Sequence, residues 1–96
     1  MKDYVIDEKT NQIIIENFLK QITIAKSMGF FEMRVEEILR RGGELPENMQ
    51  DLRKNAFARN ILMLEDDISL SKNPDYKTMR EDELRELKEK YSSYID

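Results

Sequence analysis

Apolar residues recur at helical spacing through the first half of the chain, and this stripe constrains the fold more than any other feature. Each member lies three or four residues after the one before, so all members share one helical face. The stripe consists of Ile14, Phe18, Ile22, Ala25, Met28, Phe31, Val35 and Ile38. A chain with this period buries one side of each helix by packing helix against helix.

Gly29 interrupts the stripe, and glycine inside a helix costs about 1 kcal/mol relative to alanine. The first helix could end there, with a second helix over about 31–41, or one long helix could bend at this point. Three successive steps of three residues, from Ile22 to Phe31, depart from the average helical period. The pattern favours a break over a bend.

The segment from Arg40 to Gly43 is a helix stop, because basic side chains suit the C-terminal dipole and glycine adopts the left-handed cap. Pro46 then suits the first position of a new helix, predicted over 46–70. Two helices therefore meet in an αα-hairpin with its turn at 41–46. Residues 61–64 (ILML) are apolar on every side, which predicts a central place in the fold.

A loop at 71–75 precedes the last helix, which begins at either Pro74 or Met79. The second start is supported by Thr78 and Glu81, whose spacing is that of a capping box. Tyr91, Tyr94 and Ile95 end the chain as packing residues or as an exposed docking tip.

Composition agrees with an all-α fold of three to four helices, a small helical bundle in one domain over 1–96. The chain has 3 glycines and 2 prolines, fewer than a hairpin-rich β protein needs for its turns. Residues 1–9 could form an N-terminal arm. Helices this long and this few cannot cover one another fully, so we expect self-association, most simply a homodimer.

The chain contains no His and no Cys, and 38% of its residues are charged. Most groups that perform nucleophilic or acid–base chemistry near neutral pH are therefore missing, so we expect no catalytic residues, no metal and no cofactor. No apolar run is long enough for a membrane span, and no secretion signal is recognisable. With no disulfides to form, a cytoplasmic protein is expected.

These features predict a small non-catalytic interaction protein, a regulator or inhibitor of the kind that phages and mobile elements encode. The predicted partner-binding surface is an apolar helix face that carries Met28, Phe30, Phe31 and Val35. Adjacent Phe30 and Phe31 cannot both face one core from a regular helix, so one of them is a candidate exposed aromatic. The alternative is that a break at Gly29 turns both inward.

The alternative function is a nucleotide- or nucleic-acid-binding regulator. Basic residues flank the predicted hairpin turn, and a helix N-terminus there could add to an anion site: Arg40, Arg41, Arg53, Lys54 and Arg59. A weak helix-turn-helix pattern can be placed over 35–53. A third hypothesis is a magnesium enzyme that uses the acidic run at 65–67.

Overall fold

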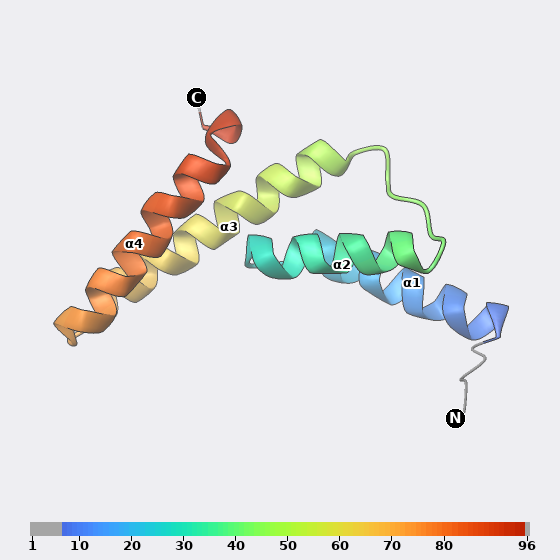
Figure 1. Cartoon of the computed structure of the whole chain (residues 1–96), viewed down its shortest axis with the longest axis horizontal. Helices are drawn as coiled ribbons and strands as arrows, with labels where there is room; N and C mark the ends of the chain where they lie inside the picture. Colours follow the sequence, from blue (N-terminus) through green and yellow to red (C-terminus); the bar gives the residue numbers. More distant parts are fainter. Residues whose placement is uncertain (1–6, 96) are drawn as a thin grey trace.

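The computed structural model describes residues 7–95 and confirms the all-α class. Its elements are α1 (Glu8–Thr23), α2 (Met28–Arg40), α3 (Met49–Leu70), α4 (Pro74–Lys90) and a 3-10 turn, η1 (Ser92–Tyr94) (Figure 1). The described part of the chain contains no strand.

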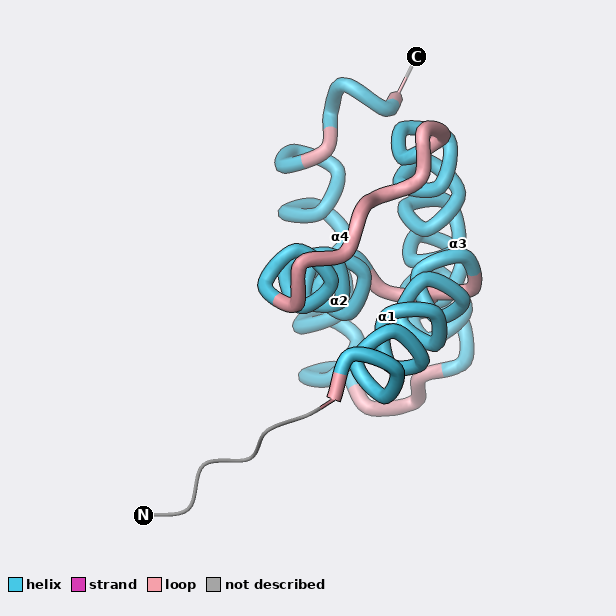
Figure 2. Tube along the Cα trace, turned by 90° about the vertical axis from the view of Figure 1, so that its right-hand side faces the viewer, coloured by secondary structure: helices cyan, strands magenta, loops and turns pink. Residues whose placement is uncertain are grey.

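The helices form two hairpins, α1 with α2 and α3 with α4, which are the most extensive helix pairings in the molecule. Figure 2 looks nearly along α1 and α2 while α3 and α4 run up the picture, so the two hairpins cross. The molecule measures 49 × 36 × 18 Å and has a radius of gyration of 16.7 Å. A compact domain of this length would have a radius near 12.5 Å, so the arrangement is open.

The break between the first two helices is confirmed, but it lies before Gly29. α1 ends at Thr23, and Gly29 is already inside the first turn of α2. Ser27 determines this start, because its hydroxyl accepts a hydrogen bond from the Phe30 amide at 3.2 Å. The three-residue steps in the stripe reflect this linker at 24–27.

The predicted stop after α2 is confirmed at Gly42, which has φ of +82°. Position 43 also requires glycine, because a side chain there would collide with Ile15 and Ile38. A methyl carbon of each lies 2.9 Å from where the Cβ atom of residue 43 would be. The predicted start at Pro46 is wrong: α3 begins at Met49. The tight turn at 41–46 is thus a longer connection over 41–48, along which Leu45 packs on the core.

Local capping sets the first residue of α4 and of α1, and it decides between the two predicted starts of α4. α4 begins at Pro74, because the Asn73 side chain accepts from the amides of Asp75 and Tyr76. Thr78 and Glu81 therefore lie inside the helix and form no capping box. α1 begins at Glu8 with Asp7 as its cap, so residues 8–9 belong to the helix, while the remainder of the predicted arm, 1–6, lies outside the described residues.

The core joins α1, α2 and the first half of α3. Its fully buried side chains include Ile22, Phe31 and Ile38, and Ala56 and Phe57 extend it onto α3. α4 contributes no buried residue at all. It contacts the core through the half-buried Leu87 and is otherwise a covering helix for α3.

Candidate functional site

Three of the four residues predicted to bind a partner are core residues, which corrects that prediction. Met28, Phe31 and Val35 expose 2%, 0% and 7% of their surface. The apolar face of α2 is covered by α1 on one side and α3 on the other. The stripe identified the buried side of α2 correctly, but helical period alone cannot tell an internal contact from an external one.

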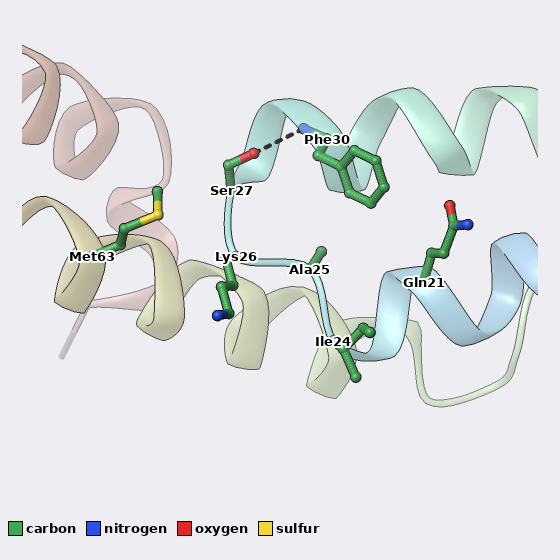
Figure 3. Close-up of a pocket in the computed structure, with 7 residues that line it drawn as sticks. All are labelled: Gln21, Ile24, Ala25, Lys26, Ser27, Phe30 and Met63. Atoms are coloured by element: carbon green, nitrogen blue, oxygen red, sulfur yellow. Dashed lines mark hydrogen bonds between the residues drawn. The ribbon is translucent and has the colours of Figure 1, made fainter.

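Phe30 is half-buried and lies beside the linker at 24–27 between α1 and α2, which we call the elbow. There it lines a shallow groove with Gln21, Ile24, Ala25, Lys26, Ser27 and Met63, which we call the elbow groove (Figure 3). The Arg34 guanidinium covers one side of the Phe30 ring at 5.0 Å from its centre and also contacts the Phe18 ring at 4.3 Å. Ile24 is the exposed apolar element of this groove, with 69% of its surface accessible.

Two neighbouring residues of α3 hold the elbow in place. Arg59 donates to the carbonyl oxygens of Ala25 at 2.7 Å and Thr23 at 3.1 Å, where α1 ends. Buried Asn60 accepts from the Met28 amide at 2.8 Å, where α2 begins. Adjacent side chains thus satisfy a carbonyl of one helix end and an amide of the next. The sequence carries no local signal for this, because each contact spans more than thirty residues.

The basic residues predicted to form an anion site do not gather into one. Arg53 binds Glu32 through two hydrogen bonds of 2.8 and 2.9 Å between α3 and α2. Arg41 donates to the side chain of Asn11 in α1 at 3.2 Å. Arg59 donates to the Ala25 carbonyl oxygen at the elbow. Arg40 is exposed on α2 and Lys54 is exposed on α3. The cluster is therefore divided among separate structural contacts.

Among residues 7–95, every shifted pKa moves away from neutrality. A hydrogen bond from the Thr10 amide lowers the pKa of Asp7, and the hydrogen bonds to Glu32 raise the pKa of Arg53. Hydrogen bonding to Tyr76 raises the pKa of Arg80, and burial raises the pKa of the Tyr91 phenol. These four shifts reinforce the ordinary ionisation states of their groups at pH 7.

A second groove lies on α3 beside the end of the chain, and we call it the outer groove. It is lined mainly by Lys54, Ala58, Ile61, Leu62, Tyr94 and Ile95. Leu62 exposes 60% and Ile95 45% of its surface, so the prediction that 61–64 is central fails for Leu62. The base of the outer groove is well packed, because the rings of Phe57, Tyr91 and Tyr94 contact one another with 5.7–6.0 Å between their centres.

The tyrosines at the end of the chain are therefore packing residues, and Ile95 is the exposed tip. Tyr94 is further tied to α3 by its hydroxyl, which donates to the Gln50 side chain at 3.0 Å. Beyond the outer groove, a shallow depression between α3 and α4 is lined by two apolar residues, Ile68 and Leu84, and by four charged ones, Glu65, Glu81, Arg85 and Lys88. The surface along the hairpin away from the core is therefore mixed, with cations of α4 in the same depression as Glu65.

No protein-family model matches the chain, and no curated protein or solved structure matches it either. Within 7–95, no helix has the length and apolar character needed to cross a membrane. In the same part of the chain, no three acidic side chains converge as metal ligands would, and Asp67 of the acidic run binds Arg80 at 3.4 Å.

Proposed function

We propose that this protein is a non-catalytic interaction protein, in the manner of a small regulator or inhibitor, and that it binds a protein partner through the outer groove. The observation that carries the proposal is the exposure of Leu62 and Ile95 on either side of a well-packed aromatic base. Exposed apolar side chains that line one concave surface are typical of protein-binding sites.

The shape of the surface supports a protein partner over a small molecule. The outer groove is open and shallow, and its lining is mostly apolar with Lys54 at one end. Small-molecule sites instead enclose most of their ligand and carry several converging polar groups. A helix or a helical hairpin would cover such a surface, with apolar residues at helical spacing.

The internal use of the basic residues favours a protein partner over a nucleotide or nucleic acid. Arg41, Arg53 and Arg59 each donate to another helix or to the elbow, so a phosphate would have to compete with these contacts. A phosphate-binding surface also needs several cations that converge.

Site-specific photocrosslinking in the native cell tests this function. A photoreactive phenylalanine analogue would replace Leu62, with Ile24 in the elbow groove and exposed Asn17 on α1 as comparison positions. We expect discrete protein adducts from position 62 and none from position 17. Adducts from position 24 alone, or the same adducts from all three positions, would contradict the proposal.

A further inference from the structure

We infer that the occupant of the outer groove is a second copy of this chain, packed antiparallel along α3 about a two-fold axis between residues 59 and 60. This inference rests on the proposed function, since it names the partner of that surface. It follows from the spacing, the size and the charge of the side chains along the outer side of α3.

The outer side of α3 carries a seam with coiled-coil spacing. Its members follow one another by 4, 3, 4 and 3 residues: Lys54, Ala58, Ile61, Glu65 and Ile68. This alternation keeps one stripe facing a partner helix over several turns. Lys54, Ala58 and Glu65 are exposed, while Ile61 and Ile68 are half-buried, and Ile68 lines the depression between α3 and α4. The seam is therefore apolar at its middle and exposed at three of its five members.

The charges of the seam are self-complementary in one orientation. Lys54 and Glu65 are eleven residues apart, about 16 Å along the helix, which is too far for an ion pair within one chain. Neither forms an ion pair with another described residue. Antiparallel pairing with the axis midway between them sets each Lys54 opposite the Glu65 of the second copy. A two-fold axis makes this contact twice.

The central apolar contacts fit the same register, in which Ile68 at the end of the seam faces Asp51 of the second copy. Ala58 then faces Ile61 of the second copy, and a small side chain opposite a large one lets two helices approach closely. Leu62 of each copy lies over the outer groove of the other, near Ala58 and Ile95. One register therefore accounts for the exposed leucine, the groove and both unpaired charges.

A parallel arrangement does not fit. It would set Lys54 against Lys54 and Glu65 against Glu65, which repels at both ends of the seam. It would also bring Ala58 against Ala58 and Ile61 against Ile61, so the small and large side chains would no longer alternate across the contact.

Sedimentation equilibrium of the purified full chain tests the inference through charge reversal. We expect wild-type particles of twice the 11.5 kDa chain mass. Lys54→Glu and Glu65→Lys each create two repulsive pairs per dimer and should weaken association by roughly 30-fold. The double variant restores opposite charges and should return to within about threefold of wild type, a result specific to this register. Asp66→Lys and Lys77→Glu are matched controls on exposed positions outside the seam, with no expected effect.

A monomer at millimolar concentration, or a double variant as weak as the single variants, would overturn the inference. Ala58→Arg provides an independent check, because a long side chain at an exposed helical position should abolish pairing. Circular dichroism and thermal unfolding should stay as in wild type when both proteins are dilute enough to be monomeric. The inference of a second copy can fail while the proposed function holds. A monomeric protein that still gives adducts to a different protein from position 62 retains an interaction surface with another occupant.

Discussion

The two hairpins of this protein differ in how much of the core they supply. α1 and α2 carry the fully buried Ile22, Phe31 and Ile38, at 0% exposure, although Ile13, Met33 and Leu39 on the same helices expose 51%, 45% and 54%. In the α3–α4 hairpin, Leu62, Leu70 and Met79 expose 60%, 77% and 49%, and α4 buries nothing. Most of the buried core thus lies in the first hairpin, and both hairpins keep some exposed apolar side chains. Under the proposed function, the first hairpin mainly stabilises the fold and the outer groove on the second binds the partner.

The comparison predicts its largest stability difference between Phe31 and Leu70. Phe31→Ala removes a fully buried ring and should lower the free energy of unfolding by about 3–5 kcal/mol. Leu70→Ala, at 77% exposure, should change it by less than about 0.5 kcal/mol. Urea unfolding at one low protein concentration measures both. Equal losses from the two variants would remove the distinction between the hairpins.

The junction between the hairpins depends on Asn60. Asn60→Leu keeps the branched shape of the side chain but leaves the buried Met28 amide without an acceptor, so we expect a loss of about 1–3 kcal/mol in the free energy of unfolding. Asn17→Leu is the matched control, because Asn17 is exposed on α1 and lies outside the outer groove. If the two variants unfolded at the same urea concentration, the elbow contact would not be a significant source of stability.

Leu62→Asp should separate binding from folding. Leu62 is exposed, so the variant should unfold within about 0.5 kcal/mol of wild type when both are dilute. The carboxylate placed over the outer groove should nevertheless abolish association. Ultracentrifugation and urea unfolding of the same preparation provide the two readouts, and a variant that still associated like wild type would exclude this surface.

The smallest effect concerns the start of α1. Hydrogen bonding from Thr10 lowers the pKa of Asp7 below its usual 3.8, so its ionised form is favoured in the folded state. The stabilisation is present above pH 3.8 and is lost as pH falls through the lower folded-state value. Asp7→Asn should therefore lose less helicity on acidification in that window. Carbon-13 NMR of the Asp7 carboxyl measures the pKa directly, and a value at or above 3.8 would contradict the assignment.

The helices could be predicted from the sequence because their signals are local. The glycine stop after α2, the break in the first stripe and the Pro74 start of α4 all depend on residues within a few positions of each other. The elbow could not be predicted, because Arg59 and Asn60 reach it across more than thirty residues of chain.

The site was harder to predict for a different reason. Periodicity identifies which side of a helix is apolar, but what covers that side depends on how the hairpins cross. Met28, Phe31 and Val35 were therefore predicted to bind a partner although they line the core. Leu62 was predicted to be central because its neighbours in 61–64 are all apolar. The spacing of the seam from Lys54 to Ile68 is visible in the sequence. Which side of α3 the other helices leave uncovered is visible only in the structure.

Solvent exposure of two methyl groups, measured against protein concentration, tests the division of roles most directly. Ile24 exposes 69% on the first hairpin and Leu62 exposes 60% on the second. We predict that relaxation of the Leu62 methyl signals by a soluble paramagnetic probe decreases between micromolar and millimolar protein, while that of Ile24 stays constant. Constant relaxation at both positions, or an equal decrease at both, would contradict the account.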